Sequence, residues 1–225
     1  MRFTVFCLMT MLSLGTMTAF AATPEPATDE QKTLYALGLA INQSLDVYTL
    51  NEAEFEIVKS GITDGFLKKA PKVDLSAYGP KLQQLQQSRA SVIAEGEKKL
   101  GAAFLAKAVA EPRTKKTESG AVVTTLKEGN GAIPEVTDMV KVSYLGTLID
   151  GTVFDNSAKQ DSPVILGMNE MSKCWKEGML MMKVGSKSKL ICPSILAYRD
   201  KGLPPLIKPG ATLVFEIELL EIVAK

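Results

Sequence analysis

The chain has 225 residues, with 26 lysines and arginines against 25 aspartates and glutamates, and it contains no histidine. This length is typical of one or two domains. The absence of histidine excludes a Ser-His-Asp triad, a Cys-His catalytic pair and histidine-built metal sites. A nearly neutral chain without a basic run argues against nucleic acid as a partner, and no phosphate-binding glycine loop is present. We therefore predict neither a metal nor a cofactor.

Residues 1–21 have the features of a secretory signal peptide. Arg2 precedes an apolar run, and Ala19-Phe20-Ala21 forms a small-x-small cleavage signature, so cleavage is expected after Ala21. A membrane anchor is the less favoured alternative, because the apolar run is short and no charged stop-transfer flank follows it. Cleavage removes Arg2 and no acid, which leaves 25 basic against 25 acidic residues in a soluble chain outside the cytoplasm.

Two cysteines remain after this cleavage, Cys174 and Cys192. In an oxidising compartment they could form a disulfide. Alternatively, they are two small buried hydrophobic residues. The sequence gives no Cα separation with which to decide between the two states, and we slightly favour the unpaired one.

The region 22–112 has helical patterns. Thr28 and Gln31 have capping-box spacing, and Asn51 and Glu54 repeat that spacing before a second helix, which Pro71 is expected to close. The apolar stripes that follow the two caps have helical spacing. They consist of Leu34, Leu37, Ile41 and Leu45 in the first helix, and of Phe55, Val58, Ile62 and Phe66 in the second.

A third helix is predicted from Gly79-Pro80 to Ala110, about 45 Å long. Its glutamine-rich middle is typical either of a solvated spacer or of an ordinary bundle helix. Three such helices make a poor core by themselves, because their apolar stripes need a partner surface. The C-terminal region could provide this surface, but a second copy of the chain is the favoured partner, so we expect a homodimer through these helices.

The region 113–225 changes to short alternating strands separated by glycine and proline. Val140, Val142 and Tyr144 alternate with polar residues, and a final strand places apolar side chains at every second position from Leu213 to Leu219. We expect a compact α+β domain here. Asp150-Gly151 predicts a turn, and Asp155 after Phe154 is by itself typical of a solvated turn residue.

Ordered motifs in both regions resemble one family. The segments GTLIDGTVFDNS, CWKEGM and LAYRDKGLPPLIKPGATLVFEIELLEI resemble FKBP-type peptidyl-prolyl isomerases. KTLYALGLAINQSL, the pair Gly61 and Asp64, and GEKKLGAAFL are similar to the N-terminal region of Mip-like and periplasmic two-domain members. The resemblance covers nearly all of residues 22–225. It implies a periplasmic, secreted or cell-surface protein with a helical dimerisation domain at 22–112 and an isomerase domain at 113–225.

The resemblance also implies the fold and the site. An antiparallel sheet curves around a short helix that starts near Ser172 or Lys173, and an apolar pocket lies between them. The implied catalytic residues are Tyr144, Phe154, Asp155, Trp175, Tyr198 and Phe215, with Trp175 as the floor of the pocket. The implied substrate-binding residues are Val164, Met171, Ser172, Leu203, Leu206 and Ile207.

The sequence departs from the family pattern near this site. Gln160 stands where an arginine usually pairs with the pocket aspartate, and Val164 is smaller than the usual aromatic residue. Ser172 and Cys174 replace an isoleucine and a glycine ahead of Trp175, and Arg199 stands where glycine is common. These changes concern the catalytic rate more than the fold.

Isomerisation of an X-Pro bond needs no nucleophile and no metal, because no bond is made or cut. The barrier of about 20 kcal/mol comes from lost amide resonance. An aromatic pocket that removes water from the planar imide favours the twisted one. We expect the substrates to be proline-containing unfolded or folding polypeptides. The alternatives are a dimeric holdase with weak or no isomerase activity and, much less favoured, a helical stalk carrying an adhesion domain.

Overall fold

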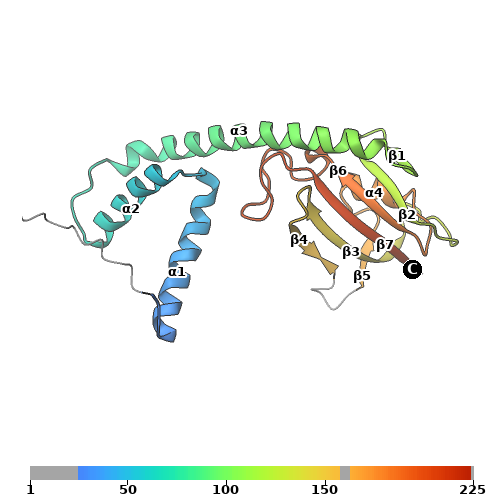
Figure 1. The fold of residues 1–225 in the computed structure, drawn as a ribbon, viewed down its shortest axis with the longest axis horizontal. Coiled ribbons are helices and arrows are strands. Elements are labelled where there is room, and N and C mark those ends of the chain that lie inside the picture. Colours follow the sequence, from blue (N-terminus) through green and yellow to red (C-terminus); the bar gives the residue numbers. More distant parts are fainter. Residues whose placement is uncertain (1–24, 158–162, 224–225) are drawn as a thin grey trace, which may run out of the picture. The chain divides into compact units, whose positions relative to one another are not determined.

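The structure, a computed structural model, describes residues 25–157 and 163–223 (Figure 1). The chain divides into two compact units, residues 1–40 and 41–225, and the boundary falls within the first helix. The division at 112/113 rests on sequence texture and stays a prediction. Within the described residues, no helix combines the length and the apolar character that crossing a membrane requires.

Both predicted capping boxes are present. The described residues contain the α-helices α1 (Asp29–Leu45), α2 (Glu52–Phe66), α3 (Leu75–Val109) and α4 (Lys173–Met179), and the short 3₁₀ helices η1 (Asp46–Tyr48) and η3 (Ser194–Leu196). The Gln31 amide donates to Thr28 Oγ1 over 3.2 Å, and the Thr28 amide donates to Gln31 Oε1 over 3.1 Å. The Glu54 amide donates to Asn51 Oδ1 over 3.0 Å, and the Asn51 amide donates back to Glu54 Oε2 over 2.9 Å. These bonds satisfy amides that a helix start leaves unpaired.

The bounds of α2 and α3 differ from the prediction. Helix α2 ends at Phe66, before Pro71, and Lys68 follows with a φ of 52°. Helix α3 begins at Leu75 and not after Pro80, because the Asp74 carboxylate accepts from the Ser76 amide over 2.9 Å and caps the helix there. Pro80 therefore lies inside the helix, where its missing N–H removes one helical hydrogen bond in an exposed stretch.

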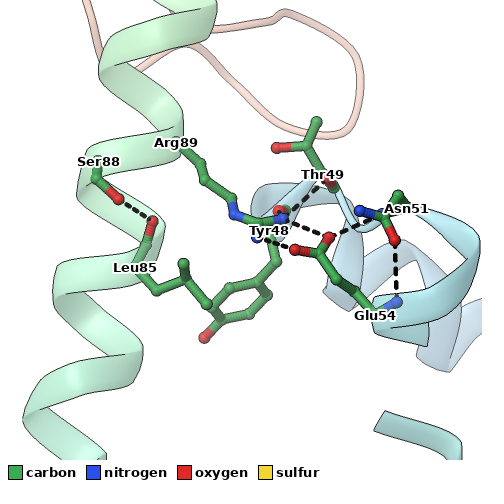
Figure 2. Close-up of polar contacts among 7 residues, drawn as sticks. All are labelled: Tyr48, Thr49, Asn51, Glu54, Leu85, Ser88 and Arg89. Carbon is green, nitrogen blue, oxygen red and sulfur yellow. Dashed lines mark hydrogen bonds and ion pairs between the residues drawn. The ribbon is translucent and has the colours of Figure 1, made fainter. Parts of the chain in front are cut away.

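An arginine of α3 holds the turn between η1 and α2 (Figure 2). Arg89 Nη1 donates to the Tyr48 carbonyl over 2.6 Å, and Nη2 lies 2.5 Å from Glu54 Oε1. The hydrogen bond from Arg89 lowers the pKa of Glu54 to about 2, so this carboxylate stays charged well into the acid range. Since Glu54 also closes the capping box, one side chain links the start of α2 to α3.

The remaining elements form one antiparallel sheet, which confirms the predicted α+β fold. Its strands are β1 (Thr114–Lys116), β2 (Val122–Lys127), β3 (Met139–Leu148), β4 (Val153–Asn156), β5 (Val164–Gly167), β6 (Lys187–Cys192) and β7 (Leu213–Val223). Their order is β1-β2-β6-β7-β3-β4, and β5 pairs with β3 beside β4. The predicted Asp150-Gly151 turn connects β3 and β4, with a φ of 88° at Gly151.

The two faces of this sheet build two cores. Successive side chains of a strand point to opposite faces. Val123, Leu190 and Phe215 belong to the main core around α4, whereas Val122, Ile191 and Val214 pack with side chains of α3 on the other face. Neighbouring residues of β2, β6 and β7 therefore serve different parts of the molecule.

Small residues on α3 allow this helix to lie close to other parts of the unit formed by residues 41–225. Ala94, Gly101 and Ala108 are the buried residues of the helix and recur every seven positions. A Cβ on Gly210 would lie 2.5 Å from the Ala94 carbonyl oxygen, and a Cβ on Gly101 would overlap the Thr212 side chain. The middle of this helix was expected to be either a solvated spacer or a bundle helix. From Ala94 to Ala108 one face of the helix is buried, while most of its other residues are exposed.

The cysteine prediction is also wrong. Cys174 and Cys192 form a disulfide, with their Cα atoms 5.8 Å apart. Both residues are buried, so the apolar environment was correctly expected and the covalent state was not. The pairing depends on a strand and a helix 18 residues apart in sequence, and their approach is a tertiary feature that the spacing does not reveal.

Two glycines of α3 give a matched test of the close contact. We expect Gly101→Ala to lower the free energy of unfolding by about 1–3 kcal/mol, because the new methyl group must displace Thr212. Gly96→Ala is the control: nothing lies within 4 Å of a Cβ there, so the higher helix propensity of alanine should raise stability by about 0.5–1 kcal/mol. Chemical denaturation of both variants measures this, and equal stabilities would contradict the contact.

Candidate active site

A hollow of about 430 Å³ lies between α4, the strands and the segment after η3. Its size is within the usual range of ligand-binding pockets. All six residues that were predicted to be catalytic line it. They are Tyr144 from β3, Phe154 and Asp155 from β4, Trp175 from α4, Tyr198 after η3 and Phe215 from β7. The convergence of these side chains is thus observed, and their catalytic roles stay predictions.

Edge-to-face contacts fix the aromatic rings relative to one another. The Trp175 ring centroid lies 5.1 Å from that of Tyr144 and 5.1 Å from that of Phe215, with interplanar angles of 83° and 79°. Phe154 meets Phe215 at 5.6 Å and 84°. Such pairs prefer this geometry. Trp175 and Phe215 are each 9% exposed, so they serve as core residues and as walls of the hollow.

A glycine in β3 makes room for two of these rings. A Cβ on Gly146 would lie 2.9 Å from Phe154 Cζ and 3.1 Å from Phe215 Cε1. Gly146 pairs with Asp155 across the β3–β4 hairpin, and the register shifts directly after it. The hairpin turn at Gly151 and the irregular register together place Phe154 against Phe215.

The sequence in isolation indicates a solvated turn residue at Asp155. In the structure, however, Asp155 lies in β4 and is half-buried. The Tyr144 hydroxyl donates to its Oδ2 over 2.8 Å, and the Asn156 amide donates to its Oδ1 over 2.8 Å. Both carboxylate oxygens therefore have partners, which reduces the cost of placing a charge beside aromatic rings. Gln160, which was considered as a partner, lies outside the described residues.

The same contact defines the state of Tyr144. Burial, followed by the hydrogen bond to Asp155 and the charge of that residue, raises the pKa of Tyr144 to about 12. Its phenol therefore stays protonated at neutral pH and keeps donating to Asp155. The pair forms a fixed polar edge on an otherwise aromatic hollow.

The predicted substrate-binding residues divide into two groups. Met171 and Ser172 line the hollow, and Ser172 also caps α4 by accepting from the Trp175 amide over 3.4 Å. Four others do not line it: Val164, Leu203, Leu206 and Ile207. Val164 starts β5 and pairs with Val142, while Ile207 is 1% exposed and belongs to the main core.

A closed loop explains where Leu203 and Ile207 lie. The amides of Leu203 and Ile207 each donate to the other residue's carbonyl, over 2.7 and 2.9 Å, and the Gly210 amide donates to the Arg199 carbonyl over 2.8 Å. Arg199 has a φ of 52°, which favours glycine. This agrees with the glycine that the family usually has at this position. Leu203 and Leu206 remain exposed on this loop.

Sequence reasoning missed several walls of the hollow. Leu213 alternates with Phe215 on the same face of β7, so its position could have been inferred from the strand pattern. The others lie in or directly after the last residues of short elements, or in the segment between β5 and α4, and carry no such signal. They are Leu166, Gly167, Glu170, Cys192, Leu196 and Ala197.

A second hollow, of about 680 Å³, lies between α3, residues 42–55 and the 201–209 loop. Of the predicted site residues it includes only Ile207. Phe55 is its one aromatic wall residue, so it lacks the ring cage of the smaller hollow. In the part of the chain that the structure describes, no group of three acidic or cysteine side chains is placed to hold a metal ion.

Two family models match the sequence. Residues 131–220 match FKBP-type peptidyl-prolyl cis-trans isomerase, and residues 30–122 match the domain amino-terminal to it. The chain is 36% identical to FKBP-type peptidyl-prolyl cis-trans isomerase FkpA of Aeromonas hydrophila, over 91% of this chain and 80% of that protein. It is also 36% identical to the FKBP-type 22 kDa peptidyl-prolyl cis-trans isomerase of Escherichia coli, over 89% and 98% respectively.

A solved structure agrees with these matches. The crystal structure of FkpA from Escherichia coli superposes with a TM-score of 0.66 at 31% identity, covering 87% of this chain and 97% of that one. The likeness includes the helical region as well as the sheet, because it extends over most of both chains. Together with the aromatic hollow, these findings show that the chain belongs to the FKBP-type peptidyl-prolyl cis-trans isomerases.

Proposed function

We propose that this isomerase acts on proline-containing segments of unfolded or folding polypeptides outside the cytoplasm, and that it works as a homodimer. One observation carries the catalytic part: five aromatic side chains and Asp155 converge on one hollow in a chain of this family. The substrate class, the compartment and the dimer are proposed on separate grounds, which follow.

The proposed catalysis is desolvation combined with fixed geometry. A prolyl ring that enters the hollow contacts Trp175 below it and Tyr144, Phe154 and Phe215 around it. The planar imide is more dipolar than the twisted one, so removing water costs the planar form more. Lowering the barrier by about 5–7 kcal/mol would accelerate the rotation roughly 10⁴–10⁵-fold.

Polar groups at the rim would orient the peptide. Tyr198 is 43% exposed at the edge of the hollow, so its hydroxyl is available to a peptide carbonyl. The Tyr144 hydroxyl is already committed to Asp155, so this pair supplies a fixed field and holds the wall in place. Leu203 and Leu206 present apolar surface on the neighbouring loop, and we propose that they contact residues that flank the proline.

The dimer is proposed from the apolar stripes of the first two helices. No residue of α1 or α2 is buried, although both helices carry the predicted stripes. Leu34, Leu37, Ile62 and Phe66, which belong to these stripes, are each more than half exposed. A second copy of the chain would cover them, as amphipathic helices require. The same surfaces favour a second activity, a holdase that shields unfolded clients.

Export is proposed from the N-terminal sequence and from the disulfide. Residues 1–21 lie outside the described residues, so the signal peptide rests on its sequence features alone. The disulfide adds support, because such bonds persist mainly in oxidising compartments. The periplasm or the cell surface would both fit.

Two separate tyrosine variants, one at the hollow and one on α3, test the isomerase site. In a protease-coupled proline isomerisation assay, Tyr198→Phe should lower kcat/KM by about twofold to tenfold, the effect of one hydrogen bond. Tyr78→Phe is the control, because Tyr78 is also 43% exposed but lies on α3, and it should leave the rate unchanged. A wild-type rate at background for several X-Pro peptides would refute the isomerase. Unchanged suppression of client aggregation by Tyr198→Phe would then favour the holdase.

Charge placed on the α1 stripe tests the dimer. We expect light scattering to give twice the mass of the processed chain at micromolar concentration. Leu37→Glu should shift the protein toward the monomer, because it places a carboxylate among side chains that pair on association. Gln43→Glu, on the opposite side of α1, carries the same added charge and should stay dimeric. A monomeric wild type would remove the proposal.

The processed N-terminus tests export. Expressed in a Gram-negative host, the protein should accumulate in the envelope with Ala22 as its first residue, as read by N-terminal sequencing. Ala21→Arg should block cleavage, because the position before the cut needs a small residue, whereas Ala22→Ser should be processed normally. Recovery of the wild type in the cytoplasm with residues 1–21 attached would contradict the signal peptide.

A further inference from the structure

We infer that the Cys174–Cys192 disulfide is a positioning device for catalysis, which holds Trp175 in place as the floor of the hollow. The bond joins the first turn of α4 to the last residue of β6. Cys174 immediately precedes Trp175, and Cys192 itself lines the hollow. This inference rests on the proposed role of the hollow and adds two residues that act on it through Trp175.

Helix α4 needs such support because it is short. It has seven residues and is capped at its start by one hydrogen bond of 3.4 Å, from the Trp175 amide to Ser172 Oγ. A helix of two turns is not stable by itself in water. Its position must therefore come from what it packs against.

Helix α4 lies beside β6 (Figure 1), and two attachments hold it there, one at each end of the helix. At the start, the disulfide fixes Cys174 to Cys192. Near the end, Gly178 lies so close to Leu190 that a Cβ there would be 2.8 Å from Leu190 Cδ1. Trp175 lies between the two attachments, so its backbone can neither slide along β6 nor rotate away from it.

The floor position matters because Trp175 contacts two walls at once. Its ring meets Tyr144 and Phe215 edge to face, each at 5.1 Å. Tyr144 in turn donates to Asp155. A shift of α4 would therefore disturb both an aromatic wall and the polar edge. The other end of the disulfide also lies at the hollow. Cys192 lines it and pairs across the sheet with Leu213, which lines it too.

This arrangement gives a reason for an unusual residue of the chain. Cys174 stands where the family usually carries glycine, next to the tryptophan of the pocket. Both cysteines are at most 1% exposed, so the bond is sealed inside the main core. The disulfide thus replaces an unconstrained helix start with a covalent connection between the floor and the wall of the hollow.

The test removes the covalent bond while keeping the fold. In the full protein, Cys174→Ala/Cys192→Ala should lower kcat/KM about tenfold, mostly through kcat, because a misplaced floor still binds the prolyl ring but holds the twisted imide less well. Trp175 is the only tryptophan, so its fluorescence reports on the floor directly. Its emission maximum should move to longer wavelength, and acrylamide should quench it more readily.

A second variant separates the bond from the volume that the sulfur atoms fill. Cys174→Val/Cys192→Ala keeps roughly the buried volume without the link, and it should show the same losses even if the double alanine variant folds poorly. Val122→Ala is the stability control: it lies on the opposite face of the sheet, so it should lower Tm while leaving kcat/KM and the emission maximum unchanged.

Three results would overturn the inference. The first is a folded Val/Ala variant with wild-type kcat/KM and emission. The second is an equal loss of kcat/KM in Val122→Ala, which would show a general effect of stability. The third is a non-reducing peptide map of the exported protein that contains free Cys174 and Cys192. A wild-type rate at background would instead refute the isomerase site, and the emission shift would still report whether the disulfide places Trp175.

Discussion

The alternation of side chains along β2, β6 and β7 is the constraint on which this structure depends. Every second residue, such as Val123, Leu190 and Phe215, faces α4 and the hollow, and the residues between them face α3. A slip of one residue would exchange the two sets, because the side-chain period of a strand is two. The hollow and the attachment of the long helix are thus fixed by the same pairing, and neither can be altered independently of the register.

Catalysis without histidine places unusual weight on this geometry. An enzyme that moves protons can tolerate small displacements if its acid and base still reach the substrate. Here the hollow offers aromatic walls and a fixed polar edge. The Tyr144–Asp155 pair shows how the field is kept fixed, since the pKa of Tyr144 is raised to about 12 and its hydroxyl remains a donor at any physiological pH. We therefore expect the rate to depend on the placement of rings more than on protonation.

Local signals were sufficient for much of the fold, and the family resemblance was sufficient for the six predicted residues that line the hollow. Both capping boxes and the Asp150-Gly151 turn are short-range patterns, and apolar residues occupy every second position of β7 from Leu213 to Leu219. The motif around Trp175 located the floor of the hollow through its family resemblance. Each of these features is encoded within a few neighbouring residues or in one ordered set of motifs.

What the sequence could not reveal depends on contacts between distant segments. The prediction began α3 at Gly79-Pro80, which was too late, because the cap at Asp74 begins the helix at Leu75. The small residues Ala94, Gly101 and Ala108 carry no apolar signal, although their size is what allows close approach. Ile207 was expected to face the substrate, but the Leu203–Ile207 pairing places it in the core. Leu196 and Ala197 were missed because a wall made by a 3₁₀ turn has no periodic pattern.

The disulfide is also a contact between distant segments, and it holds the ring that forms the floor of the hollow. If the rate depends on placement, then a residue that holds the floor of the hollow contributes to catalysis without touching the substrate. A seven-residue helix has few noncovalent means of fixing one ring, since each packing contact is weak alone and the cap is a single long hydrogen bond. A covalent bond needs only one partner, and an oxidising compartment makes it available. Export and catalysis would then be linked through Cys174: the compartment in which the clients fold would also complete the site that acts on them.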